Sequence, residues 1–170
     1  MARIAFIVDD MFEDAEFTDP YDKVRKAGHH AVIVGLTAGK EITGKNGAKA
    51  TVELASSEAD AEEFDALVIP GGYSPDKIRT DENLVTLTQR MFAAGKPVAA
   101  ICHAPWMLAE ADILRGRTIT SYPSVKTDVK NAGATWIDKE VVEDENLITS
   151  RHPGDIPAFC DALLNQLDRR

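Results

Sequence analysis

Cys102 and His103 are the residues of this sequence whose types and positions most directly indicate chemistry. The apolar run 97–101 ends abruptly at this pair, and a helical pattern that includes Trp106, Met107 and Leu108 follows at once. Such a pattern predicts a cysteine on the sharp turn between a buried strand and a helix, where the helix end favours an anion. We therefore predict a reactive, thiolate-like nucleophile at Cys102, although most free cysteines are simply small buried hydrophobes.

Three carboxylates, Glu13, Asp14 and Glu16, begin the helical pattern that follows the first predicted strand. Asp14 is most simply interpreted as a partner of the helix dipole. One of the two glutamates, Glu16 in the first place and Glu13 in the second, is predicted to project towards the sheet edge that carries Cys102. A carboxyl group beside a thiolate is driven towards its protonated form and can then donate a hydrogen bond or a proton.

Gly71 and Gly72 follow the predicted strand 66–70 directly. Two glycines let backbone N–H groups approach a ligand closely, so we predict oxyanion-type donors beside Cys102. A plain tight turn is the alternative interpretation.

His103 and His152 are the two candidates for a general base. His103 adjoins Cys102, but adjacency in sequence does not make the side chains meet, and His152 follows another strand that ends at the same sheet edge. His29 and His30 are interpreted as surface residues, and Cys160 as a core residue of the last helix.

Two other kinds of site are excluded by their surroundings. Residues 39–45 nearly spell a phosphate-binding loop, but Asn46-Gly47 and an alternating stretch follow where the motif requires Ser or Thr and a helix. Asp9-Asp10 suggests a magnesium-dependent phosphoacceptor, which would need an aspartate where Pro70 stands. No group of His and Cys residues has the spacing of metal ligands, so we expect neither a metal nor a cofactor.

The bulk properties narrow the partners and the compartment. A chain of 170 residues predicts one domain, 1–170, and a net charge of −9 argues against nucleic acid as a partner. No apolar run is long enough for a membrane span or a signal peptide, and two cysteines form no disulfide framework. We therefore expect a cytoplasmic protein with no membrane partner.

Apolar runs alternate with helical patterns along the chain, which predicts an α/β fold with a mostly parallel sheet covered by helices on both faces. In such sheets functional groups gather at the carboxyl ends of the strands. The predicted strands are 4–8, 31–36, 66–70, 98–101, 118–121 and 147–150, the predicted helices are 14–28, 82–94, 124–132 and one that begins at 155, and residues 40–54 are predicted to form a small hairpin.

Four stretches, 12–16, 64–72, 95–103 and 128–134, together resemble the PfpI family over essentially the whole chain. The resemblance implies a flavodoxin-like three-layer sandwich related to class I glutamine amidotransferase domains. Members have been described as intracellular cysteine peptidases and also as deglycases and glutathione-independent glyoxalases. By position, the resemblance assigns the nucleophile, its partner, the acid beside the thiol, the oxyanion turn and a tyrosine near the pocket to Cys102, His103, Glu16, Gly71 with Gly72, and Tyr122.

The resemblance also places Asp76 where family members carry an acid, usually glutamate, that crosses a subunit interface to complete a triad. The shorter aspartate weakens the match to the peptidase geometry. A second departure is Ala104-Pro105-Trp106, which stands where the family usually has Gly-Pro-Gln.

The predicted function is that of a cofactor-free enzyme in which Cys102 adds to a reactive carbonyl. The expected substrates are a small dicarbonyl or an early glycation adduct on a protein, which makes the enzyme a glyoxalase or deglycase with a role in stress protection. An intracellular cysteine peptidase acting on peptides is the first alternative, and a cysteine redox sensor or holdase is the second. The resemblance further implies a homo-oligomer, either a dimer or a hexamer.

Overall fold

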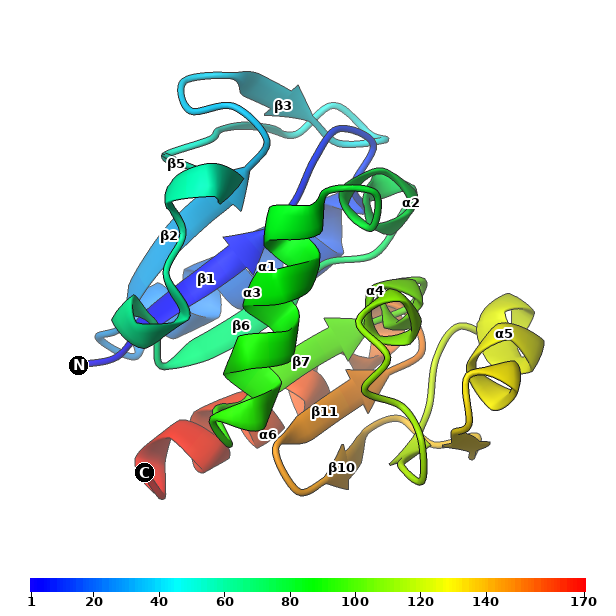
Figure 1. Ribbon diagram of the computed structural model, residues 1–170. Helices are drawn as coiled ribbons and strands as arrows, with labels where there is room; N and C mark the ends of the chain where they lie inside the picture. Colours follow the sequence, from blue (N-terminus) through cyan, green and yellow to red (C-terminus); the bar gives the residue numbers. More distant parts are fainter.

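A seven-stranded sheet forms the centre of the molecule, described here from a computed structural model of residues 1–170 (Figure 1). Its order is β10-β11-β7-β6-β1-β2-β5, and all neighbouring strands are parallel except β10 and β11. The strands are β1 (Arg3–Ile7), β2 (His30–Gly35), β5 (Leu54–Ala55), β6 (Ala66–Ile69), β7 (Val98–Ile101), β10 (Val142–Asp144) and β11 (Leu147–Ser150). Every residue of β6, β7 and β11 is buried, as a parallel sheet covered on both faces requires.

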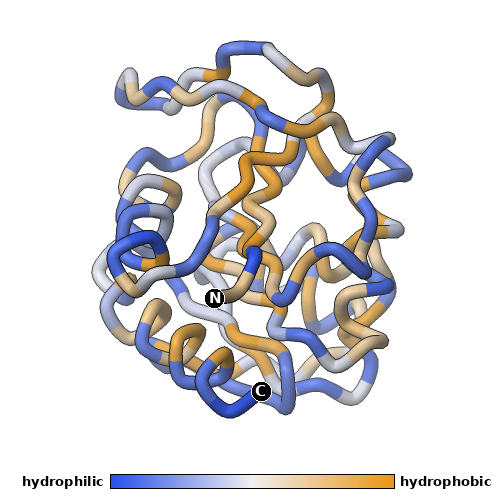
Figure 2. The backbone as a smooth tube through the Cα atoms, turned by 90° about the vertical axis from the view of Figure 1, so that its left-hand side faces the viewer, coloured by the Kyte–Doolittle hydropathy of each residue, from blue (hydrophilic) through white to orange (hydrophobic).

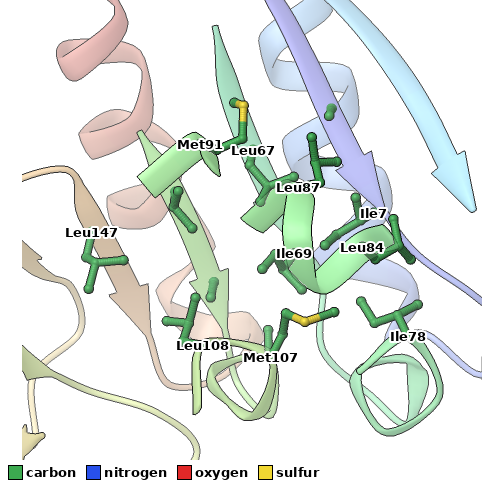
Figure 3. Close-up of a cluster of buried hydrophobic side chains, with 14 of the residues drawn as sticks. Ile7, Leu67, Ile69, Ile78, Leu84, Leu87, Met91, Met107, Leu108 and Leu147 are labelled. Atoms are coloured by element: carbon green, nitrogen blue, oxygen red, sulfur yellow. The ribbon is translucent and has the colours of Figure 1, made fainter. Parts of the chain in front are cut away.

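Helices cover both faces of this sheet and bury two separate apolar clusters. Helices α1 (Asp14–Lys26) and α6 (Ile156–Asp168) pack on one face, where Phe6, Phe17 and Phe159 are buried. The other face is covered by α3 (Glu82–Ala93), with α2 (Ser74–Ile78), α4 (Pro105–Glu110) and α5 (Lys126–Asn131) beside it. The apolar segments run through the middle of the molecule (Figure 2), and Leu67, Met91 and Met107 lie in the cluster under α3 and α4 (Figure 3). The predicted three-layer α/β sandwich is confirmed.

The predicted hairpin is confirmed as β3 (Glu41–Thr43) and β4 (Lys49–Thr51), which pair antiparallel. Asp14 holds the turn between them, because its two carboxylate oxygens accept the N–H groups of Asn46 (3.0 Å) and Ala48 (2.8 Å). The hairpin is therefore attached to the first turn of α1.

The prediction of a strand over 118–121 was wrong in extent and in place. Only β8 (Thr118–Ile119) forms, and it pairs with β9 (Thr135–Trp136) in a separate two-stranded sheet. Side chains, rather than a neighbouring strand, accept two of the backbone N–H groups of this segment. Asp144 Oδ2 accepts from Thr118 N–H, and Thr149 Oγ1 accepts from Thr120 N–H. The predicted helix 124–132 is likewise shorter, since residues Pro123–Val125 form a 3₁₀ helix, η3, ahead of α5. Three further 3₁₀ helices are η1 (Ser56–Glu58), η2 (Ala61–Glu63) and η4 (Pro153–Asp155).

The carboxyl ends of β1, β6 and β7 meet at one edge of the sheet, away from the two chain ends (Figure 1). From β1 the chain runs outward to β2 and β5, and it then returns to β6 on the other side of β1. This topological switch point is where α/β sheets place their ligand crevices. None of the helices combines the length and the apolar character needed to span a bilayer.

Candidate active site

Cys102 lies on a tight turn that directly follows β7. Its φ of 66° is in the left-handed region, which a non-glycine residue rarely adopts without a structural constraint. Two backbone hydrogen bonds supply that constraint: Cys102 N–H donates to the Ser150 carbonyl (3.0 Å), and the Cys102 carbonyl accepts from Tyr122 N–H (2.9 Å). The turn aims the thiol into a pocket of about 330 Å³ lined by Glu13, Glu16, Lys45, Gly72, Tyr73, Cys102, His103, Tyr122 and Pro153.

His103 meets the thiol even though the two residues are adjacent in sequence. Its Nδ1 lies 3.1 Å from Cys102 Sγ, and its Nε2 lies 3.3 Å from Ser124 Oγ. The ring stacks on Tyr122 at a centroid distance of 5.0 Å, and Trp106 packs against it edge-on. Burial and the nearby Lys45 cation lower the pKa of His103, so the imidazole is neutral at neutral pH.

Glu16 is fully buried in the first turn of α1. Its Oε1 accepts a hydrogen bond from Gly71 N–H (3.0 Å), whereas its Oε2 has no hydrogen-bond partner in the protein. Burial, and then the negative charge of Glu13, raise the pKa of Glu16 to about 8. The carboxyl group is therefore protonated at neutral pH, as the sequence predicted for an acid held beside Cys102.

The prediction of a thiolate-like Cys102 was wrong for the free protein. Only 7% of the residue is exposed, and burial is the main reason that its thiol pKa lies above the ordinary value. An ionised Glu16 would act in the same direction, whereas the N–H groups of Gly72 and His103 point at the sulfur and favour the anion. Helix α4 begins only at Pro105. These two N–H groups, rather than a helix end, therefore offset part of the effect of burial on the thiol pKa.

The two glycines of the oxyanion turn have different tasks. Gly71 offers no free donor, because Glu16 takes its N–H. A Cβ at Gly71 would lie 2.4 Å from Glu16 Oε1 and 2.8 Å from Cys102 Cβ, so glycine is needed there for close packing. Gly72 has a φ of 79° and directs its N–H at Cys102. The donors beside the sulfur are therefore Gly72 and His103, and the expected donor Gly71 is corrected.

Glu13 lies at the pocket mouth, where its carboxylate binds Lys45 Nζ at 2.9 Å. The ammonium group also lies 5.5 Å above the centre of the Tyr73 ring. Sequence reasoning missed Lys45 and Tyr73, because the hairpin and α2 bring them to the pocket only in the folded chain. The signal that was present is the basic residue in the Gly44–Gly47 turn of the predicted hairpin.

Two candidate residues are not brought to the thiol. His152 turns back on its own segment, where its Nδ1 accepts from Gly154 N–H (3.1 Å), and it does not line the pocket. Asp76 is exposed on α2 and also lies outside the pocket of its own chain. Tyr122 does line the pocket, and its side chain is 41% exposed.

Among the side chains, no group of three or more His, Cys, Asp or Glu residues is arranged to hold a metal ion. The chemically active groups of the pocket are one thiol, one neutral imidazole, one protonated carboxyl and two backbone donors. Such a set can add sulfur to an electrophilic carbon, stabilise the oxyanion that forms and transfer protons on both sides of it.

Comparison with known proteins places this pocket in a family. The model of the DJ-1/PfpI family matches residues 2–166. The chain is 49% identical over 159 residues to protein/nucleic acid deglycase 2 of Escherichia coli, an alignment that covers 92% of each chain. It is 45% identical to deglycase PfpI of Pyrococcus furiosus, with 92% of this chain and 94% of the relative covered. It is 46% identical to YraA of Bacillus subtilis, whose name describes a candidate cysteine protease, with 97% and 98% covered.

Solved structures that resemble this chain carry the same family names as these relatives. A two-domain protein of Anabaena variabilis with DJ-1/ThiJ/PfpI-like and ferritin-like domains superposes with a TM-score of 0.97 at 40% identity. The alignment covers 99% of this chain but only 48% of that protein, so the chain spans about half of its length. Drosophila melanogaster DJ-1beta superposes with a TM-score of 0.91 at 30% identity, covering 98% of this chain and 90% of the other.

Proposed function

This chain belongs to the DJ-1/PfpI family, and from that premise we propose that it is a cysteine-dependent enzyme acting on reactive carbonyl compounds. The observation that carries the proposal is the arrangement around one sulfur atom. Cys102 Sγ has the His103 imidazole at 3.1 Å, the protonated Glu16 carboxyl beside it and two backbone N–H groups directed at it.

In the proposed first step the sulfur of Cys102 attacks the aldehyde carbon of a dicarbonyl such as methylglyoxal. The thiol proton passes to His103 Nδ1, a carbon–sulfur bond forms, and the carbonyl oxygen becomes an oxyanion beside the N–H groups of Gly72 and His103. Return of the proton to that oxygen gives a neutral hemithioacetal. An aldehyde suits this site, because its carbon is electrophilic enough to react as the buried thiol loses its proton.

Glu16 is proposed to carry out the proton shift that follows. With a pKa of about 8 the carboxyl can exchange protons in both directions near neutral pH. Its ionised form removes the proton from the former aldehyde carbon while the neighbouring carbonyl oxygen takes a proton, which gives an enediol. The carboxyl then returns its proton to the second carbon as the hydroxyl group on the first carbon loses its proton and becomes a carbonyl, and the product is a thioester of Cys102. Water then cleaves the thioester, so that the net reaction adds one water to methylglyoxal and releases lactate and the free thiol.

An early glycation adduct would enter at the same step. Attack of the Cys102 sulfur on the carbon that bears the nitrogen breaks the carbon–nitrogen bond and frees the protein amine after protonation. The later steps are those of the free dicarbonyl. The deglycase names of two relatives support this extension.

Peptide hydrolysis is the second candidate, supported by the contact between Cys102 and His103 and by the name of the relative YraA. It would require an acyl-enzyme and a protonated amine leaving group, and therefore a base with more support than a neutral imidazole alone provides. The exposed position of Asp76 on α2 offers such support only if a second chain contributes it.

The deciding experiment measures consumption of methylglyoxal by the purified protein without glutathione. The Cys102→Ser and Glu16→Gln variants are assayed beside it, together with casein hydrolysis on the same preparations. We expect lactate formation by the wild type and a loss of at least about a hundredfold in each variant, a factor within the usual range for nucleophiles and proton-transfer groups.

Asp22→Asn serves as a matched control, because this carboxyl lies elsewhere on α1, beside a separate surface groove. Casein cleavage that depends on Cys102 without dicarbonyl turnover would replace the proposal with a peptidase. Activity in neither assay would leave the redox sensor as the alternative. The function of such a sensor would persist in the Glu16→Gln variant.

A further inference from the structure

Ser124 does not line the thiol pocket, but it contacts His103, which does. It lies in η3, and its Oγ is 3.3 Å from Nε2 of His103. The opposite ring nitrogen, Nδ1, is the one that faces Cys102 Sγ at 3.1 Å. A single imidazole ring therefore connects the nucleophile to a serine hydroxyl of the same chain.

The segment that carries Ser124 is attached to the nucleophile itself. Tyr122 N–H donates to the Cys102 carbonyl (2.9 Å), and Val125 N–H donates to the Tyr122 carbonyl (2.9 Å). The hydroxyl is thus positioned by the same backbone turn that aims the thiol. A shift of Ser124 relative to Cys102 would require breaking these bonds.

Two aromatic rings hold the imidazole in this orientation. Tyr122 stacks on it with an interplanar angle of 21°, and Trp106 packs edge-on at 5.0 Å. Trp106 is itself fixed, because its Nε1–H donates to Asp128 Oδ2 at 2.9 Å. The ring therefore has little freedom to rotate, and the remaining question is which nitrogen carries its proton.

The protonation of the thiol answers that question. A neutral imidazole has one N–H donor and one bare nitrogen acceptor, and the hydrogen bond made by one nitrogen selects the role of the other. The S–H of Cys102 needs an acceptor, and Nδ1 is the ring nitrogen within reach. With Nδ1 as that acceptor, the ring proton belongs on Nε2, and the Ser124 oxygen is the group placed to accept it.

We propose that Ser124 is a positioning residue which, by accepting a hydrogen bond from His103 Nε2–H, holds Nδ1 free to take the proton of the Cys102 thiol. His103 is thereby oriented by a hydroxyl of its own chain. This inference rests on the proposed thiol chemistry, but it makes a separate statement about the resting protein.

The first test is therefore made without substrate. Nitrogen-15 NMR of histidine-labelled protein reports which nitrogen of His103 is protonated. We expect a proton on Nε2 and a bare Nδ1 in the wild type, and a mixture of both tautomers in Ser124→Ala. Ser124→Thr retains the hydroxyl and should restore the wild-type spectrum.

The second test follows the reactivity of the thiol. Iodoacetamide should alkylate Cys102 in Ser124→Ala roughly tenfold more slowly than in the wild type, with mass spectrometry identifying the modified cysteine. For methylglyoxal, kcat should fall by a similar factor, about 1.4 kcal/mol in activation free energy, with KM unchanged. Ser57→Ala removes an exposed hydroxyl in η1 that does not line the pocket. It is the control for the loss of a serine hydroxyl elsewhere in the protein.

Two results would overturn the inference. One is a Ser124→Ala protein with the wild-type tautomer and wild-type alkylation rate. The other is an Asp76→Asn protein whose His103 spectrum changes in the way expected of Ser124→Ala, since an acid from a second chain would then orient the ring. If the wild type turns over no dicarbonyl, the proposed function fails, while the spectra and alkylation rates still decide the role of Ser124.

Discussion

Cys102 and Glu16 place two acidic protons side by side in a buried space, and each ionised group would make ionisation of the other harder. The resting site therefore holds no net charge at the sulfur, and the thiolate forms only as His103 takes the proton. A neutral resting thiol at neutral pH also resists oxidation better than an exposed thiolate. Resistance to oxidation is the opposite of what a redox sensor needs.

At the scale of single residues, the proton held by the buried Glu16 carboxyl makes the free energy of unfolding depend on pH. In the unfolded chain the carboxyl ionises around pH 4.5, whereas the folded protein retains the proton until about pH 8. The stabilisation is complete below the first value and is lost as the pH rises towards the second. Replacement by glutamine removes the titrating group. Between pH 4.5 and pH 9 the free energy of unfolding of Glu16→Gln should therefore rise, relative to that of the wild type, by on the order of 4 kcal/mol.

Urea unfolding of both proteins at several pH values measures this difference. Glu62→Gln, which changes an exposed glutamate of η2, is the control for a lost negative charge. A constant gap between Glu16→Gln and the wild type across the pH range would contradict the prediction.

At the scale of elements, the sequence was sufficient wherever burial alone determines the structure. The continuous apolar runs of β1, β6, β7 and β11 could be recognised because strands buried on both faces need no alternation. The short elements α2, β9 and β10 escaped prediction, because each is too short to show a pattern of its own. β9 forms only by pairing with the distant β8, and β10 by pairing with the neighbouring β11.

The attachment of the hairpin to α1 gives a prediction about one such long-range contact. Asp14 accepts the N–H groups of Asn46 and Ala48, and Lys45, which directly precedes Asn46 in this turn, lines the pocket. Asp14→Ala should speed hydrogen exchange of both amides and destabilise the protein by on the order of 2 kcal/mol, as expected for lost hydrogen bonds to a charged group.

Displacement of Lys45 in the Asp14→Ala protein should also raise KM for methylglyoxal several-fold. Asp14→Asn keeps one acceptor oxygen and should protect one of the two amides. Unchanged exchange at Ala48 in Asp14→Ala would show that the turn holds its shape without α1.

At the scale of the molecule, the topology explains which parts of the site could be inferred from the sequence. Cys102, Glu16 and Gly72 follow three strands that end at one edge, so the rule for parallel sheets was enough to bring them together. Ser124 and Lys45 come from connections outside the central sheet, and no rule of strand order places them. His152 follows β11 at the same edge, yet a local hydrogen bond to Gly154 N–H turns it away.

Association of whole chains is the remaining prediction, and the pocket mouth is where it can be tested. Met11, Tyr73 and Tyr122 are 42%, 56% and 41% exposed, and the backbone of Tyr73 bonds to that of Met11. Exposed apolar side chains grouped in this way favour burial against another protein surface.

We expect sedimentation velocity to find a dimer or hexamer, and we expect Tyr73→Ser to shift the oligomeric state towards single chains. Ile137→Ser removes an exposed apolar side chain next to β9 and should leave the assembly intact. A wild type that sediments as single chains at every concentration would contradict the prediction, and the exposed side chains at the pocket mouth would then have another role.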